Sequence, residues 1–557
     1  MTDVFATLAE AKAYSPPTAP SFIQIAGYSM VGDGGGASYK SVPTQPAHAG
    51  KFSIKLSDGV TIVWYELSEQ IPTSAMLGAV RDGSTDDTAA IHALVAYVKS
   101  KGLENFVISP GFHAVTMVEI EKLNGHEITF LGYLSGIATT AKDAVFRLKN
   151  SAAVRIIGPK VTAGKNLNYK CGMLFDTDIA GGQAWSGCSK ISLVNPVATS
   201  VAKAMQWGNT SFPDTLISEN SVVGGYWYEV QQGVEVIGSQ AFLSLESLQN
   251  ICGSTSGSSE WLAIEPFAVR SVGSEVRTGK CEHLLTARTN GVVFVMEPVA
   301  STTYGNPYGQ IYSTDDACET ASPLLKVRNP SALATPTSAT SRFQISGHHG
   351  YHSQNTAEFL QVLDTTYAGF LHVGPGNSYG PVARTYANIY SQSAQCHIFQ
   401  DDCAFGSGFR KGLGSIVGGI VHFSKRDIMQ MYDAGDQVLA ANVMAKVGFT
   451  ARRTGEDYER FYGNFAAGTF TTPQPLKDVE VSFCMQTSPY NYDVSFLVNA
   501  GVDVFPIAGK ANTTTLAGGT VKLGDVPAGT AIQLQAVSSG GATTILQYDR
   551  MIISARY

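Results

Sequence analysis

One segment between residues 77 and 111 constrains the fold more than any other part of the chain. Residues 77–91 read LGAVRDGSTDDTAAI, a turn rich in glycine and aspartate that leads into a helix. Apolar residues between Ile91 and Val98 follow the i, i+3, i+4, i+7 spacing of one buried helical face. A strand-like run follows at once over 105–111, and almost no further helix can be predicted for roughly 300 residues. A single helix that opens a long all-β region is typical of a lid on the end of a β-solenoid.

Three oxygen-bearing side chains mark the start of this helix. Asp86, Asp87 and Thr88 stand directly before its apolar face. Side chains of these types accept hydrogen bonds from the unpaired amide groups of a first turn, and the negative charges favour that end of a helix. We therefore expect these residues to cap the helix.

The same segment resembles the opening of a known fold family. Its pattern GAxxDGxTDDTxAI is similar to the start of pectate-lyase-like right-handed parallel β-helix proteins, among them bacteriophage tailspikes, polygalacturonases and some glucanases. Residues 25–39, IAGYSMVGDGGGASY, are similar to the segment that precedes this opening in many tailspikes. The resemblance implies an all-β chain: a right-handed parallel β-helix with an N-terminal capping helix and a C-terminal β-sandwich.

Changes in residue composition and pattern along the sequence predict three domains. Residues 1–75 would form a head that attaches to the virion, and 76–410 the β-helix that carries catalysis or receptor binding. Beyond a glycine-rich linker, residues 411–557 alternate strongly between apolar and polar positions, which predicts an antiparallel β-sandwich. The resemblance implies trimerisation or receptor contact for this last domain.

Composition and charge exclude several classes of partner. A net charge of −7 gives the chain no basic footprint, so nucleic acid is not expected as a partner. The N-terminus has no basic region before an apolar run, and no apolar stretch reaches about 18 residues, so neither a secretory signal nor a membrane span is expected. An acidic surface also repels an acidic polysaccharide unless a local basic patch offsets it.

Cysteine and histidine spacing predicts no metal and no cofactor. The chain has eight cysteines without C-x-x-C spacing, and we expect buried free thiols. His348, His349 and His352 lie close together, but no neighbouring carboxylate or cysteine completes a ligand set. A role in loop packing or sugar contact is therefore expected for His348.

Three glutamates share a local pattern that suggests stacked coils. Glu246, Glu265 and Glu297 each follow two apolar residues at alternate positions, and the last two are 32 residues apart. Periods of 20 to 50 residues are typical of solenoids. Copies stacked on adjacent coils would place the carboxylates in an outward column about 5 or 10 Å apart, which suits glycosidic hydrolysis by paired carboxylates. The alternative is three solvated surface glutamates that share only a preference for strand ends.

Two further groups offer carboxylates. Asp315 and Asp316 are reserve catalytic candidates, although a solvated turn explains such a pair equally. Tyr226, Trp227 and Tyr228 precede Glu229, which makes Glu229 another acid or base candidate.

Sugar rings stack on tyrosine and tryptophan faces, and three consecutive aromatic residues cannot all point into a core. At least one of residues 226–228 is therefore expected to be exposed, and Trp261 is expected to extend the aromatic platform. Arg270 would bind acidic sugar groups, or would belong to a solvated, charge-balanced face.

Taken with the resemblance, these features predict a homotrimeric phage tailspike that binds and depolymerises host cell-surface polysaccharide: capsule, exopolysaccharide or O-antigen. The expected chemistry is carboxylate-mediated hydrolysis by an endo-acting glycoside hydrolase. The N-terminal region would contact other virion tail proteins, so the expected location is the virion tail, outside the cell after host lysis. A polysaccharide lyase on the same fold and a non-enzymatic receptor-binding fibre remain the alternatives.

Overall fold

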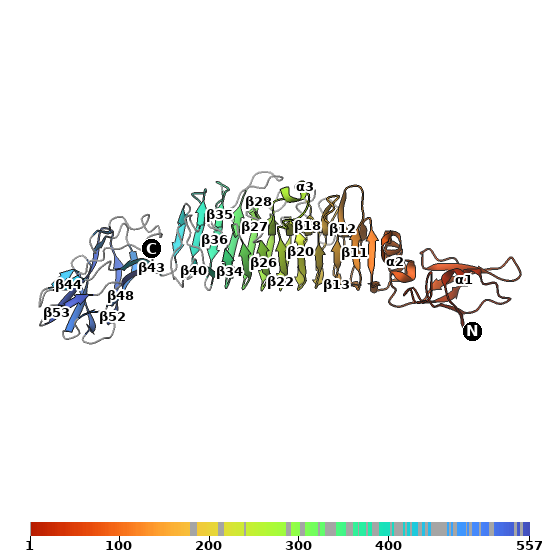
Figure 1. The fold of residues 1–557 in the computed structure, drawn as a ribbon, viewed down its shortest axis with the longest axis horizontal. Helices are drawn as coiled ribbons and strands as arrows, with labels where there is room; N and C mark the ends of the chain where they lie inside the picture. Colours follow the sequence, from red (N-terminus) through yellow and green to blue (C-terminus); the bar gives the residue numbers. More distant parts are fainter. Residues whose placement is uncertain are drawn as a thin grey trace. The chain divides into compact units, whose positions relative to one another are not determined.

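The computed structural model places most of the chain in β-strands (Figure 1). It describes residues 2–556 with the exception of 179–186, 210–216, 239–240, 286–290, 301–306, 321–322, 329–340, 353–359, 366, 375–376, 381–388, 401–403, 406–415, 418–419, 424–425, 433–436, 440–443, 447–464, 467–468, 472–475, 486, 489–492, 501–502, 512–516, 540–542 and 546–549. Contacts divide the chain into two compact units. The first comprises Met1–Phe370, Ser378–Val382 and Ser391–Cys396, and the second comprises the remaining residues to Tyr557. The three-domain division from the sequence stays a prediction.

The first unit begins with a five-stranded sheet of order β1-β2-β3-β5-β4. Its elements are β1 (Thr2–Phe5), α1 (Leu8–Ala13), β2 (Phe22–Ile25), β3 (Ala37–Val42), β4 (Lys51–Lys55) and β5 (Ile62–Leu67), followed by the short 3-10 helix η1 (Ala75–Leu77). The Tyr97 hydroxyl donates to the carbonyl of Leu67 at 2.7 Å, and Lys101 pairs with Glu66 at 3.2 Å. These contacts hold the sheet against the helix that follows.

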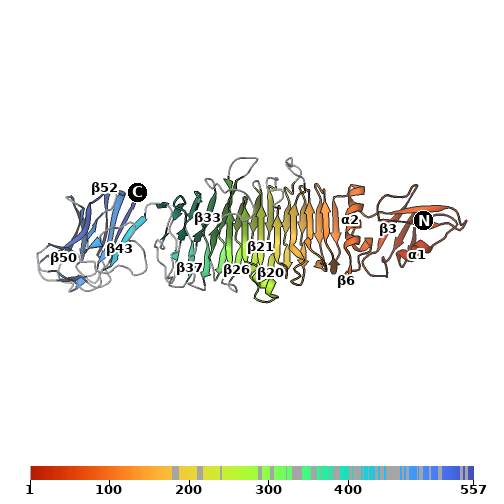
Figure 2. The same cartoon turned by 90° about the horizontal axis from the view of Figure 1, so that it is seen from above.

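That helix, α2 (Thr88–Lys101), lies next to the first coil in both views (Figures 1 and 2). The predicted apolar face is buried: Ile91, Leu94, Val95 and Val98. Of the predicted caps, only the Asp86 carboxylate accepts from the first-turn amide of Thr88, at 2.9 Å.

Asp87 serves a different purpose from the predicted cap. Its carboxylate points back to the preceding turn and accepts from the amides of Val80 and Arg81. It also contacts the buried His113 at 2.9 Å. The carboxylate therefore fastens the turn to the first coil.

After α2 the described residues wind repeatedly through three strands, one in each of three parallel sheets, and the strand counts given for these sheets refer to those residues. Sheet 1 has twelve strands: β7 (Asn105–Ile108), β10 (Glu127–Phe130), β13 (Arg155–Ile157), β16 (Ser192–Val194), β19 (Asn220–Val223), β22 (Phe242–Glu246), β25 (Glu275–Gly279), β30 (Gln310–Thr314), β33 (Arg342–Ser346), β36 (Phe370–Val373), β39 (His397–Gln400) and β42 (Ile420–Phe423). Sheet 2 also has twelve: β6 (Asp82–Asp86), β8 (Phe112–Val115), β11 (Tyr133–Gly136), β14 (Lys160–Thr162), β17 (Val197–Thr199), β20 (Tyr226–Val230), β23 (Gln249–Cys252), β26 (Glu282–Leu285), β31 (Ala317–Thr320), β34 (His349–His352), β37 (Ser378–Gly380) and β40 (Ala404–Phe405).

Sheet 3 has eleven strands: β9 (Val118–Glu121), β12 (Lys142–Lys149), β15 (Tyr169–Asp176), β18 (Lys203–Trp207), β21 (Gln232–Ile237), β24 (Phe267–Val272), β27 (Val292–Glu297), β32 (Leu325–Val327), β35 (Leu360–Val362), β38 (Ile389–Ser391) and β41 (Ile416–Val417). An insertion between β23 and β24 carries α3 (Ser259–Ala263), and one between β27 and β30 carries the strand pair β28 (Val299–Ala300) and β29 (Pro307–Tyr308). Equivalent strands of successive coils lie side by side in Figures 1 and 2. The predicted parallel β-helix is confirmed.

Burial differs between the outer faces of the sheets. Strands of sheet 1 alternate between buried and open positions, as in β25 and β30, so their outer face meets solvent. In sheet 3 the strands β21 and β27 are buried on both faces. The sequence of β27 is a nearly continuous apolar run, as expected for a strand covered on both sides, whereas β21 contains the charged Glu235. A charged side chain on the outer face of sheet 3 therefore needs a partner.

The second unit contains the antiparallel pairings predicted for the C-terminal region. One sheet joins β43 (Arg426–Tyr432), β55 (Arg550–Arg556), β48 (Leu476–Met485) and β52 (Ala517–Val526). A second sheet contains β44 (Gln437–Leu439), β54 (Thr543–Ile545) and β49 (Thr487–Ser488). A third contains β46 (Phe465–Ala466), β47 (Thr469–Thr471), β53 (Ala531–Ser539), β50 (Asp493–Ala500) and β51 (Asp503–Ala511), and β45 (Met444–Lys446) pairs with β53. No helix in the described part of the chain is long and apolar enough to span a membrane.

Candidate functional site

Charged side chains follow the outer face of sheet 3 from coil to coil. Strand register pairs Glu119 of β9 with Arg147 of β12, and Glu235 of β21 with Arg270 of β24. The alternate residues of these strands point into the core, so these side chains lie on the outer wall. We call the following set the sheet 3 ladder: Glu119, Asp143, Arg147, Lys149, Asp176, Lys203, Gln206, Glu235, Glu265, Arg270, Glu297, Lys326 and Arg328.

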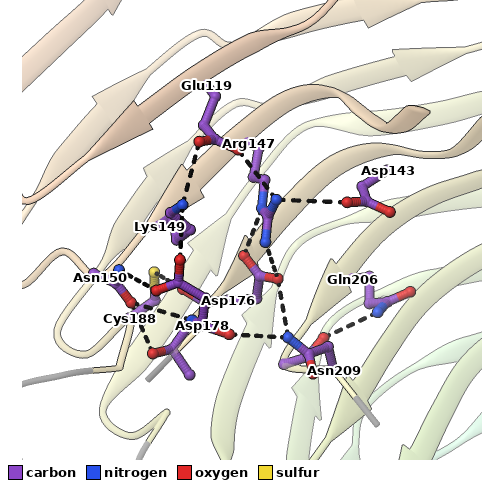
Figure 3. Close-up of polar contacts among 12 residues, drawn as sticks. Glu119, Asp143, Arg147, Lys149, Asn150, Asp176, Asp178, Cys188, Gln206 and Asn209 are labelled. Atoms are coloured by element: carbon purple, nitrogen blue, oxygen red, sulfur yellow. Dashed lines mark hydrogen bonds and ion pairs between the residues drawn. The ribbon is translucent and has the colours of Figure 1, made fainter. Parts of the chain in front are cut away.

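The N-terminal part of the ladder is centred on one arginine (Figure 3). Arg147 donates from Nε and Nη2 to the two carboxylate oxygens of Asp176, each at 2.9 Å, and from Nη1 to Glu119 at 3.1 Å. Asp176 is 1% exposed and also accepts from Asn209 at 3.1 Å. Burial acts to lower the pKa of Arg147, but the hydrogen bonds and charge of Asp176 outweigh it and raise that pKa. This bidentate pair is the stronger kind of ion pair in proteins.

The C-terminal part of the ladder alternates acids and bases over several coils. Glu235 accepts from Lys203 and, at 2.8 Å, from Arg270. The other end of the Arg270 guanidinium donates to Glu297 at 2.7 Å. Burial acts to raise the pKa of Glu235, but the charges of Lys203 and Arg270 prevail and lower it.

Arg328 joins two of the glutamates predicted from the sequence. Its Nε donates to Glu297 and its Nη1 to Glu265, both at 2.7 Å. The Glu297 side chain is 2% exposed, whereas that of Glu265 is 33% exposed and also meets Lys326 at 3.5 Å. One guanidinium therefore holds a buried and an accessible carboxylate beside each other.

The predicted column of three glutamates is wrong, because its members do not share a register. Glu246 ends β22 in sheet 1, where it pairs with Gly279 and is exposed. Glu297 ends β27 in sheet 3 and pairs with Val272. Glu265 lies between α3 and β24, outside any strand. The shared pattern marked similar local sequences from different walls of the coil.

The aromatic candidates on strand β20 of sheet 2 point alternately outward and inward. Tyr226 and Tyr228 are 39% and 51% exposed and Trp227 is fully buried, which confirms that at least one of the three is exposed. Trp227 is therefore not a surface contact. The half-buried Glu229 accepts from Ser200 at 3.0 Å and pairs with Lys165 at 3.3 Å. Trp261 does not extend the platform, because α3 turns its side chain inward, where it is buried.

The two neighbouring aspartates also differ in exposure. Asp315 is exposed at a corner where the backbone has a φ of 56°, while Asp316 points into the coil and is fully buried. His348 is also fully buried, so it cannot contact a sugar at the surface, and burial lowers its pKa to about 4. Asp316 and His348, but not Asp315, belong to a group of side chains inside the coil. We call this group the interior cluster: Asn250, Thr278, Cys281, His283, Ser313, Asp316, Cys318 and His348.

The interior cluster satisfies Asp316 with neutral and histidine donors. The carboxylate accepts from the Cys281 amide at 2.8 Å and from the hydroxyls of Thr278 and Ser313. His283 contacts it at 3.2 Å. Burial acts to raise the pKa of Asp316, but the hydrogen bond and charge of His283 and the other donors lower it to about 2.

The open face of sheet 1 carries a row that alternates aromatic rings and arginines. The Arg277 guanidinium lies 5.2 Å from the ring centre of Phe242 and 5.6 Å from that of Tyr312, on the coils at either side. Arg342 lies 5.7 Å from the ring centre of Phe370. Such a surface stacks sugar rings and pairs with acidic substituents.

The sequence analysis missed most of the ladder, including Arg147, Asp176, Glu235 and Arg328. A signal for Glu235 was present: it is the single charge in the apolar strand-like run 233–238. A charge within a strand that is buried on both faces requires a partner on the next strand.

Comparisons with known proteins found similar solved structures but no similar sequence. No family model matches the sequence, and no curated protein matches it. A similar solved structure is the enzymatically active domain of tailspike protein 2 from bacteriophage CBA120, at 10% identity and a TM-score of 0.46, covering 99% of this chain and 86% of that one. Another is tailspike gp49 of Acinetobacter baumannii bacteriophage Fri1, a capsular polysaccharide depolymerase, at 9% identity and 0.34, covering 100% and 98%.

A third similar structure is WceF of Pantoea stewartii, a glycan biofilm modifying enzyme with a tailspike-like parallel β-helix. It is 12% identical with a TM-score of 0.37, and the match covers 98% of this chain and 71% of that one. The predicted likeness to tailspikes with a parallel β-helix is confirmed at the level of the fold. At these identities the comparisons carry no argument about activity.

Proposed function

We propose that this chain is a bacteriophage tailspike that binds and depolymerises a host cell-surface polysaccharide, and that cleavage takes place at the C-terminal part of the sheet 3 ladder. The observation that carries the proposal is the position of Glu265 and Glu297 on the single guanidinium of Arg328. Hydrolysis of a glycosidic bond uses two carboxylates about 5–9.5 Å apart. Two carboxylates that share one guanidinium are close enough to flank one linkage.

The roles of the pair follow from their surroundings. Glu297 is buried between Arg270 and Arg328, so it serves as the base or nucleophile only after substrate displaces Arg328 and opens it to the sugar. Glu265 is accessible to solvent and suits the acid that protonates the glycosidic oxygen. An acidic sugar group that pairs with Arg328 or Lys326 frees Glu265 from its partner as substrate binds. The row of Arg277 with Phe242 and Tyr312 supports the proposal as a second glycan contact.

The proposal extends to assembly and location. The chain acts as a homotrimer in the virion tail, and the region of β1–β5 contacts other tail proteins. Its substrate is capsule, exopolysaccharide or O-antigen, and the protein acts outside the cell after host lysis. These parts rest on the resemblance of residues 25–39 and 78–91 to tailspike sequences.

The test is a digestion of host polysaccharides by the purified protein, with new reducing ends measured and products identified by mass spectrometry. We expect Glu265→Gln and Glu297→Gln each to lower the rate at least about 100-fold, the loss typical of a removed acid or base. Glu127→Gln is the matched control, because Glu127 forms an exposed ion pair with Arg155 on sheet 1. Full activity in both ladder variants would show that the ladder is structural.

Two alternatives have their own signatures. Non-enzymatic receptor binding is favoured by one observation: the carboxylates of Glu235, Glu265 and Glu297 are all paired with cations. It predicts tight polysaccharide binding without new reducing ends. A lyase would leave an unsaturated sugar, so ultraviolet absorbance that rises during digestion would exclude hydrolysis.

A further inference from the structure

Three potential metal ligands meet inside the coil, away from the ladder. Cys281 and His283 lie at the start of β26, and Asp316 lies at the corner between β30 and β31 on the next coil. One ligand atom from each residue lies within 4.8 Å of the other two, and all three side chains are buried. They belong to the interior cluster, and the proposed cleavage does not use them.

The donor set suits zinc. Zinc in proteins is bound by thiolate, imidazole and carboxylate groups at about 2.0–2.3 Å, which places ligand atoms of a tetrahedral site about 3.3–3.8 Å apart. A contraction of about 1 Å brings these three atoms to that spacing. The fourth ligand of a tetrahedral site would then be a water or a hydroxyl oxygen of Thr278 or Ser313, both of which hydrogen-bond the Asp316 carboxylate.

A second observation comes from Asn250. This side chain is fully buried, and within the described residues its Oδ1 has no hydrogen-bond partner. Its Nδ2 lies 3.0 Å from Nδ1 of His283. Exchanging the amide nitrogen and oxygen, which have nearly the same shape, lets Oδ1 accept from a protonated Nδ1.

That exchange leaves the Nε2 lone pair of His283 facing the Asp316 carboxylate at 3.2 Å. Two electron pairs at this distance repel each other unless a proton or a metal ion lies between them. A metal-binding histidine ordinarily donates its other ring nitrogen to such an acceptor. Asn250 is placed to supply it.

We propose that Cys281, His283 and Asp316 bind one structural zinc ion inside the β-helix, with Asn250 orienting the histidine. The ion links two successive coils, and it enters while the coils close during folding, because the site is buried in the finished structure. Binding displaces the thiol proton of Cys281 to solvent. Without a metal, burial raises the pKa of that thiol to about 12, so it stays protonated.

The first test measures metal in the full chain, produced in medium supplemented with zinc and then dialysed. We expect about one zinc ion per chain by mass spectrometry of the elements, as for a structural site. Chain produced with cobalt should show the absorption band of a thiolate bound to cobalt. Less than about a tenth of an ion per chain, with no such band, would overturn the proposal, and the cluster would then be a hydrogen-bond network alone.

Variants locate the ion. Cys281→Ser should abolish the cobalt band, and Asp316→Asn should lower the zinc content at least about tenfold. Cys252→Ser is the matched control, because Cys252 is an equally buried free thiol outside the ligand group, and it should keep both signals. A cobalt band that survives in Cys281→Ser would place the ion elsewhere and contradict the assignment. Circular dichroism establishes that each variant is folded.

Discussion

The sheet 3 ladder and the interior cluster both bury carboxylates, but they stabilise them differently. On the outer wall, Glu297 and Asp176 are each 1% exposed and are paired with arginines. Inside the coil, the fully buried Asp316 accepts from hydroxyls, a backbone amide and a histidine. In the chain without metal, the same functional group is thus held by arginine charges on one side of the wall, and by hydroxyls, a backbone amide and a histidine on the other.

The difference shows which side chains can pair with a buried carboxylate on each side of the wall. Arginine and lysine have long stems that lie along an outer surface and reach acids one or two coils away. Inside the coil, the positions around Asp316 are taken by short polar side chains, among them Thr278, Ser313 and Cys281. Function that needs contact with a polymer belongs to the outer wall, whereas the interior serves to join coils.

The largest expected effect tests the interior. Asp316→Asn turns an amide nitrogen toward the donors of Thr278, Ser313 and His283, so we expect the free energy of unfolding to fall by about 3 kcal/mol. Asp315→Asn is the control, since Asp315 is exposed and asparagine tolerates its positive φ. It should change stability by no more than about 0.5 kcal/mol. Chemical unfolding of the proteins prepared without metal, followed by tryptophan fluorescence, measures both, and equal losses would contradict the contrast between the two aspartates.

Lowering the pH should remove the stability that the ionised Asp316 carboxylate contributes. In the folded protein without metal the pKa of Asp316 is about 2, against about 3.9 for an unfolded chain. A depressed carboxyl pKa stabilises the fold above the unfolded value, and this stabilisation is lost as pH falls toward the folded value. The gap in stability between the wild type and Asp316→Asn should therefore narrow between about pH 4 and pH 2. A gap that stays constant through this range would mean that the charge of Asp316 is not what stabilises the coil.

A smaller effect tests the outer wall. Arg147→Met leaves Asp176 buried with only part of its hydrogen bonds, and we expect a loss of about 2 kcal/mol. Arg155→Met removes an exposed pair with Glu127, which should cost at most about 0.5 kcal/mol. Thermal unfolding of the two variants in low and high salt measures the difference. Similar losses in both would show that burial of the ladder does not strengthen its pairs.

Local patterns in the sequence predicted the elements well. The turn and helix at 77–101 and the parallel coils that follow were expected from spacing and resemblance, and strand alternation predicted the exposure of Tyr226 or its neighbours. The glutamate pattern failed, because Glu246 and Glu297 end strands of different sheets. Loop lengths between coils vary, so a similar local sequence did not mean the same position around the coil.

The sequence by itself determined that this chain winds into parallel coils behind a helical lid, since periodic apolar residues and a capped turn act over a few neighbouring positions. Tertiary structure alone decided which charges meet. Arg328 reaches Glu265, 63 positions earlier, and Cys281 lies beside Asp316, 35 positions later, only because successive coils stack in register. Pairing of strands in the third dimension, rather than distance along the chain, brings these groups together.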